Sequence, residues 1–145
     1  MGRTEKGTIA LIDDNEDNRF IFRTWLEERY NVVEFSEGHD AIIGMKECKP
    51  DWVFLDISLP GIDGIEVLRR IRSDDNLRQI PVFALTAHGM IGDRERFLAL
   101  GFDDYIGKPI LDLRTLTSVI ENAARRALQD KNGKTPNRFL IRAGP

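Results

Sequence analysis

Cysteine and histidine are scarce in this sequence, and long apolar runs are missing. The 145 residues include one cysteine, Cys48, and two histidines, His39 and His88. An internal disulfide needs two cysteines, and zinc sites built from Cys and His need a larger set, so both are excluded. No apolar run approaches the length that crosses a bilayer, and residues 1–7 lack the apolar centre of a signal peptide. We therefore expect a cytoplasmic protein with no membrane partner.

A strong excess of one charge is also missing. The chain has 21 basic and 24 acidic residues and a formal net charge of -3. This balance does not favour a nucleic-acid surface or an anionic membrane as the main partner. The hydrophobic content of 41% is ordinary for a globular protein, and the length suits one domain with a real core.

Short apolar strands alternate with helical patterns along most of the chain. Trp52 to Leu55 is a run of four apolar residues that ends in Asp56, and Pro60 and Gly61 soon follow. Such a run is typical of a strand buried on both faces of a parallel sheet. The alternation predicts five strands, each followed by a helix, at 8–12, 31–35, 52–56, 80–85 and 103–106. The result is an α/β fold with right-handed crossovers.

The expected helix starts follow from capping residues. Asp13 to Asn15 are good N-caps, so we expect the first helix behind them, with Phe20, Ile21, Trp25 and Leu26 on its inner face. Ser36 is expected to cap the second helix in the same way.

The boundaries of the domain follow from composition. Residues 1–128 are expected to form one domain, and the polar residues 129–145 a C-terminal tail or linker stub. Near its end, Asp103 and Asp104 are expected to be turn acids.

Polar side chains follow four of the five strands. Asp13 and Asp14 follow the first strand, Asp56 ends the third, Thr86 ends the fourth and Lys108 follows the fifth. The carboxyl ends of parallel strands share one edge of a sheet. Three carboxylates gathered there repel one another unless a cation joins them, and all-oxygen ligands favour Mg²⁺, with Mn²⁺ as a substitute. A lysine and a hydroxyl beside such a carboxylate are suited to hold a phosphoryl group on Asp56.

Five separated motifs occur along the chain in this order: Leu11-Ile12-Asp13-Asp14-Asn15, Phe54-Leu55-Asp56, Leu59-Pro60-Gly61-Ile62-Asp63-Gly64, Ala84-Leu85-Thr86-Ala87 and Asp104-Tyr105-Ile106-Gly107-Lys108-Pro109. Together they resemble the receiver domain of bacterial two-component response regulators, from about Thr8 to Leu128. The resemblance implies a flavodoxin-like (βα)5 fold, a doubly wound parallel sheet with strand order 2-1-3-4-5.

The resemblance also implies a role for each residue of the acidic group. Asp56 would be the phosphoacceptor and, with Asp14, a direct Mg²⁺ ligand. Asp13 would act through water, and the backbone carbonyl of Ser58 would complete the protein's ligands. Lys108 would pair with Asp56 and bind the phosphoryl group.

A switch pair is implied as well. The hydroxyl of Thr86 would move toward the phosphate, and the ring of Tyr105 would turn into the vacated space. Residues 97–106 would then change most on activation. The Lys108-Pro109 peptide bond is expected to be cis.

The implied function is a phosphorylation-activated signalling switch. A histidine kinase or a histidine phosphotransfer protein would donate the phosphoryl group from a phosphohistidine. In receivers the first helix, here with Asn15, Asn18 and Ile21, usually meets this donor. A downstream protein target would then bind the phosphorylated form, which is a monomer or a phosphorylation-dependent dimer. The chain would not be an enzyme beyond self-phosphorylation and self-dephosphorylation, and no nucleic acid is expected as a partner.

Two alternatives come from other classes. A haloacid-dehalogenase-like phosphatase also uses an aspartate nucleophile and Mg²⁺, but it needs a second aspartate two residues further on, where this chain has Ser58. A phosphorylation-independent interaction module would keep the fold without using the acids. The complete acidic set argues against it.

Overall fold

The computed structural model of the chain describes residues 6–87, 92–110 and 112–131. Within these ranges, strands and helices alternate as the sequence predicted. The strands are β1 (Thr8–Ile12), β2 (Asn31–Phe35), β3 (Trp52–Asp56), β4 (Val82–Thr86) and β5 (Asp104–Gly107), and the helices are α1 (Glu16–Leu26), α2 (Gly38–Cys48), α3 (Gly64–Ser73), α4 (Asp93–Leu100) and α5 (Leu113–Lys131). All strand pairs are parallel, and their order is β2-β1-β3-β4-β5. The predicted strand order 2-1-3-4-5 is confirmed.

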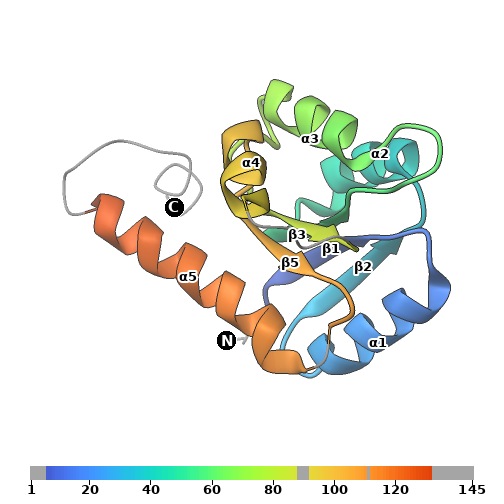
Figure 1. The fold of residues 1–145 in the computed structure, drawn as a ribbon, viewed down its shortest axis with the longest axis horizontal. Coiled ribbons are helices and arrows are strands. Elements are labelled where there is room, and N and C mark those ends of the chain that lie inside the picture. The colour runs from blue at the N-terminus through green and yellow to red at the C-terminus, as the bar shows by residue number, and fades with distance from the viewer. Residues whose placement is uncertain (1–5, 88–91, 111, 132–145) are drawn as a thin grey trace.

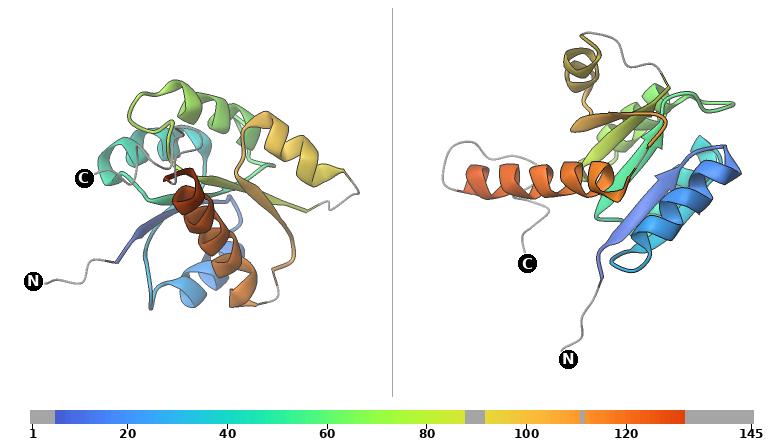
Figure 2. Two further views of the ribbon diagram at one scale, coloured as in Figure 1. Left: turned by 90° about the vertical axis from the view of Figure 1, so that its left-hand side faces the viewer. Right: turned by 60° about the horizontal axis from the view of Figure 1, so that its bottom comes forward.

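Helices cover both faces of the sheet (Figures 1 and 2). α1 and α5 lie on one face, and α2, α3 and α4 lie on the other. β3 serves both layers: the side chain of Phe54 belongs to the apolar cluster beneath α1 and α5, whereas Val53 and Leu55 belong to the cluster on the opposite face. All three residues are fully buried. Burying each such side chain contributes about 1.5–3 kcal/mol, which fixes the strand that ends in Asp56.

The inner face of α1 differs from the prediction. Phe22 and Leu26 are buried, but Phe20 is 57% and Ile21 41% exposed. Neighbouring residues of a helix are separated by about 100°, so a core stripe through positions 22 and 26 turns positions 20 and 21 outward. Trp25 is half-buried against the same core cluster. The prediction was right for Leu26 and wrong for Phe20 and Ile21.

The N-cap of α2 is also not the predicted one. Glu37 occupies the cap position without a side-chain hydrogen bond, and the helix begins at Gly38, so Ser36 does not cap it. A Cβ on Gly38 would lie 2.6 Å from side-chain atoms of Ile62 and Val67. Close packing of α2 on its neighbours therefore sets where this helix begins.

Asp103 and Asp104 are buried, and neither is a simple turn acid. Asp103 Oδ2 accepts hydrogen bonds from Arg72 Nη2 at 2.9 Å and from the Val82 backbone N–H at 2.7 Å. Asp104 Oδ1 lies 3.5 Å from Arg94 Nε. Buried carboxylates require cationic or hydrogen-bonding partners. Through these partners Asp103 links the start of β5 to α3 and β4, and Asp104 links it to α4.

The remaining boundaries shift slightly. β4 begins at Val82 rather than residue 80, and β5 runs through Gly107. The Lys108-Pro109 bond is cis, as expected. His88 and the tail residues 132–145 lie outside the described residues, so the predicted tail from residue 129 stays a prediction.

Candidate functional site

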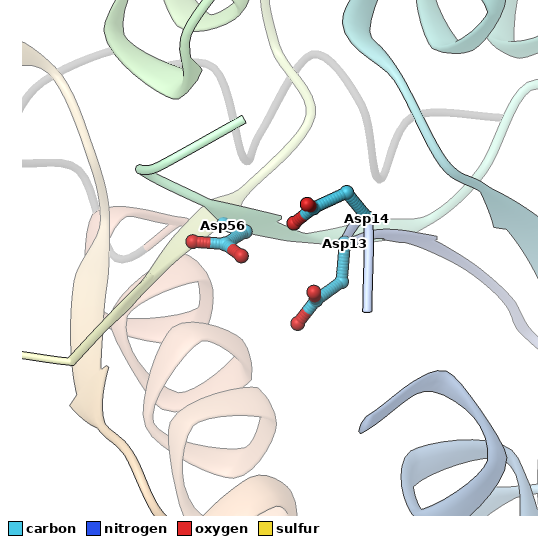
Figure 3. A group of neighbouring side chains, drawn as sticks. All are labelled: Asp13, Asp14 and Asp56. Atoms are coloured by element: carbon cyan, nitrogen blue, oxygen red, sulfur yellow. The ribbon is translucent and has the colours of Figure 1, made fainter. Parts of the chain in front are cut away.

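Three carboxylates meet at the carboxyl ends of β1 and β3 (Figure 3). Asp13 and Asp14 follow β1 directly, and Asp56 is the last residue of β3. One carboxylate oxygen from each residue lies within 4.8 Å of the others. Asp13 and Asp56 are buried, whereas Asp14 is exposed. The parallel pairing of the two strands thus brings together residues more than forty positions apart.

Lys108 joins two of these acids. Its Nζ donates to Asp56 Oδ2 at 2.9 Å and lies 3.2 Å from Asp13 Oδ2. Its backbone N–H donates to the carbonyl of Thr86 at 2.7 Å, which fixes the residue at the end of the β4–β5 pair. The structure therefore places the lysine against Asp13 and Asp56, while its role toward a phosphoryl group stays a prediction.

The pKa values of this pair reflect burial and charge together. Burial raises the pKa of Asp56 above its ordinary value, and the charge of Asp13 adds to the rise, although the contacts with Lys108 and the Ser58 N–H oppose it. Burial alone would lower the pKa of Lys108, but its contacts with Asp56 and Asp13 raise it overall. Lys108 thus stays charged and compensates one of three neighbouring negative charges.

The turn after β3 holds the other oxygen of Asp56. The Ser58 backbone N–H donates to Asp56 Oδ1 at 2.9 Å. A Cβ on Gly64 would lie 2.4 Å from the Asp56 backbone oxygen and 2.7 Å from Ile57 Cα, so this position requires glycine. The start of α3 is thereby pressed against the end of β3, and the position of Asp56 is fixed from behind.

Asp13 is held by the first turn of α1. The backbone N–H of Asn15 donates to Asp13 Oδ1 at 2.9 Å, and Asn18 Nδ2 lies 3.4 Å from Oδ2. Arg19 Nη1 donates to the Asp13 carbonyl at 2.7 Å. Sequence reasoning gave Asn18 no role toward Asp13 and did not single out Arg19, because polar residues on an exposed helix usually face solvent.

Thr86 and Tyr105 lie on the neighbouring strands β4 and β5. Thr86 ends β4 and is buried, one residue beyond Leu85, which pairs with Asp56 in the sheet. Tyr105 on β5 is half-buried, and its ring lies 5.6 Å from that of Phe97. Thr86 is thus at the edge that carries the acids, whereas Tyr105 packs toward α4.

The site has the donor chemistry of a divalent-cation site. Its carboxylates are hard oxygen donors, and Lys108 compensates only one of the three negative charges. Mg²⁺ prefers such ligands and keeps several waters, which the exposed side of Asp14 allows. A doubly wound α/β fold with this acidic edge has the arrangement that the resemblance noted in the sequence implies.

The comparisons with known proteins give the same class. The family model of the response regulator receiver domain matches residues 9–121. The polar-differentiation response regulator DivK of Brucella anthropi is 39% identical over 104 residues, which cover 71% of this chain and 85% of that protein. DivK of Brucella ovis is 38% identical with the same coverage. The chain belongs to the response regulator receiver domain family.

Solved structures share the fold. The receiver domain of the sensor histidine kinase PA1611 from Pseudomonas aeruginosa PAO1 is 31% identical with a TM-score of 0.72, over 81% of this chain and 96% of that one, and its structure has a magnesium ion coordinated in the active site cleft. The chemotaxis response regulator CheY4 of Vibrio cholerae has a TM-score of 0.74 at 19% identity, over 81% and 98% of the two chains. The second likeness shows the fold alone.

Family membership gives the function in outline. The chain is a phosphorylation-dependent signalling switch of two-component systems, and membership of this family implies a histidine kinase as phosphodonor. It is a regulatory domain and not an enzyme of the haloacid-dehalogenase type. Among the described residues, none of the helices combines the length and the apolar character of a membrane span.

Proposed function

We propose that Asp56 accepts the phosphoryl group from a phosphohistidine of a partner histidine kinase or histidine phosphotransfer protein. The observation that carries the proposal is the contact of Lys108 with Asp56 inside a group of three carboxylates. An Asp56 oxygen attacks the phosphorus, the P–N bond to the imidazole breaks, and its electron pair returns to the donor nitrogen. Aspartate carboxylates serve as phosphoryl acceptors in this way.

We further propose that Asp13, Asp14, Asp56 and the Ser58 carbonyl hold Mg²⁺, with Asp13 acting through water. The ion would supply positive charge to the phosphoryl oxygens. Lys108 supplies a second charge from the β5 side. Burial and the neighbouring Asp13 raise the pKa of the Asp56 carboxyl, so its carboxylate is more basic than an exposed one.

Thr86 and Tyr105 are proposed to report the phosphorylation. Thr86 lies at the same sheet edge as Asp56, and Tyr105 pairs with Ala84 of the same strand and packs its ring on Phe97 of α4. A hydroxyl drawn toward the phosphate leaves space that the ring of Tyr105 fills, so residues 97–106 change most. Chemical-shift changes confined to other elements would contradict this path.

The proposed partners and setting follow from the family. A downstream protein target would bind the phosphorylated form, either as a monomer or as a phosphorylation-dependent dimer. A cytoplasmic location beside the kinase stays a prediction. The assignment of residues 129–145 to a tail or linker stub stays a prediction as well.

Acetyl phosphate in Mg²⁺ tests the acceptor. The wild-type chain is expected to gain one phosphoryl group, by intact mass, and to lose this reactivity in EDTA. Asp56→Asn removes the acceptor and is expected to abolish the label. Asp63→Asn is the matched control, because Asp63 lies in the same loop and caps α3 by accepting a hydrogen bond from the Glu66 backbone N–H, a role that asparagine can keep. Label retained on the Asp56→Asn chain would reject Asp56 as the acceptor.

A further inference from the structure

Arg19 connects the acidic group to the edge strand of the sheet. Its Nη1 donates to the carbonyl of Asp13 at 2.7 Å, and its Nε donates to Glu34 Oε1 on β2 at 3.1 Å. The Arg19 side chain is only 17% exposed, and that of Glu34 is 24% exposed. The guanidinium is therefore held at two points by its planar fork, a geometry that a lysine cannot reproduce.

The same strand also holds the other side of the Asp13 backbone. The Asp13 N–H donates to the carbonyl of Phe35 at 3.1 Å, and Phe35 follows Glu34 directly in β2. A closed ring results, made of three hydrogen bonds and the peptide bond between Glu34 and Phe35: it runs from Asp13 to Phe35, Glu34 and Arg19 and back to Asp13. The carbonyl that Arg19 holds belongs to the peptide bond between Asp13 and Asp14. This peptide determines how both carboxylates leave the chain.

Glu34 has a second arginine partner, so the effect of a lost charge can be separated from the effect of a lost contact with the Asp13 backbone. Arg23 Nη1, one turn further along α1, also bonds to Glu34, through Oε2. Arg19 and Arg23 carry the same charge and share one acid. Of the two, Arg19 is the one with a hydrogen bond to the Asp13 carbonyl.

We propose that Arg19 is a positioning residue for the Mg²⁺ site: by holding the Asp13–Asp14 peptide against Glu34, it orients both carboxylates for the cation. The inference rests on the proposed function, because it assigns this residue to the same site. The positive charge of Arg19 alone would weaken Mg²⁺ binding, since a cation near the acids repels Mg²⁺, whereas the proposed positioning strengthens it. Groups that orient metal ligands from behind contribute about 10–100-fold to metal affinity.

The test compares Arg19→Gln with Arg23→Gln in Mg²⁺ titrations followed by ¹H–¹⁵N spectra. Both variants lose one charge and one bond to Glu34. We expect Arg19→Gln to bind Mg²⁺ about tenfold more weakly than Arg23→Gln. Arg19→Lys keeps the charge without the fork and is expected to be weakened as well; it also serves if Arg19→Gln does not fold. Equal affinities of the Arg19 and Arg23 variants would overturn the inference.

A second readout needs no metal. The Asn15 N–H bonds to Asp13 Oδ1, so its hydrogen exchange reports how well Asp13 is held. In metal-free protein we expect faster exchange at Asn15 in Arg19→Gln than in Arg23→Gln. Unchanged exchange would overturn the positioning role while the phosphorylation of Asp56 stands. Absence of Mg²⁺ binding by the wild-type chain would overturn both proposals.

Discussion

Removal of the Asp103 carboxylate is expected to destabilise the protein strongly. Its side chain is 2% exposed and pairs with Arg72, which is 20% exposed. Arg72 also bonds to the segments before β4 and β5, donating to the carbonyls of Ile80 at 2.7 Å and Gly101 at 2.8 Å. Burial of the guanidinium lowers the pKa of Arg72 to about 10.

The magnitude follows from the groups left behind in Asp103→Ala. Breaking a buried ion pair by removing one partner costs about 3–5 kcal/mol. The carbonyl contacts of Arg72 remain, which favours the lower end of this range. The buried Val82 N–H loses its carboxylate acceptor, and an unsatisfied donor adds about 1–3 kcal/mol. Because the two losses overlap, we expect about 4 kcal/mol in the free energy of unfolding.

Urea unfolding measures this loss. With a slope of about 2 kcal/mol/M, the midpoint should fall by about 2 M. Asp75→Ala is the matched control, because the Asp75 side chain is 89% exposed in its pair with Arg78, and such pairs contribute at most about 1 kcal/mol. A loss below about 1 kcal/mol in Asp103→Ala, or equal losses in the two variants, would refute the reasoning.

Three further predictions follow from burial and close packing. The pKa of Asp56 is raised from 3.8 in the folded state, so the stability it contributes falls as pH rises from below 3.8 through the folded pKa. Without Mg²⁺, Asp56→Asn should therefore raise the melting temperature at pH 7, and this gain should disappear near pH 3; a gain independent of pH would contradict the linkage. Gly64→Ala should cost about 1–3 kcal/mol by overpacking against backbone, whereas Gly107→Ala, which meets no atom within 4 Å, should cost less in the same unfolding assay. Phe22→Ala should cost about 3–5 kcal/mol and Phe20→Ala less than 1, and comparable losses would contradict the observed orientation of α1.

The strand ends were predictable because the pattern that specifies them is local. An apolar run that stops at a polar residue marks the end of each strand, and the helices between the strands make the strands parallel, so Asp13, Asp56 and Thr86 lie at one sheet edge. The assignment of the metal ligands, the phosphoacceptor and the switch pair depends on the resemblance to receiver domains, and these roles remain proposals. The structure adds the proximity of Asp13, Asp14 and Asp56 and the contact of Lys108 with Asp56.

The errors arose where partners are distant in sequence or where a helix phase is ambiguous. Arg72 and Asp103 are 31 positions apart, and no local pattern links them. The contact of Arg19 with the Asp13 carbonyl depends on how α1 lies against β2, which composition does not encode. For α1 itself, apolar residues at 20, 21, 22, 25 and 26 allow two stripes, and packing chooses between them.

Lys108 connects the carboxylate of Asp56 to the main chain at the end of the β4–β5 pair. Its amino group contacts the acids of two strands, while its own N–H bonds to the last residue of β4. If Asp56 is phosphorylated as proposed, a shift of this amino group would pull on the short stretch of main chain that closes the β4–β5 pair. The amino group that contacts Asp56 and the backbone N–H that bonds to the end of β4 thus belong to the same residue, directly after β5.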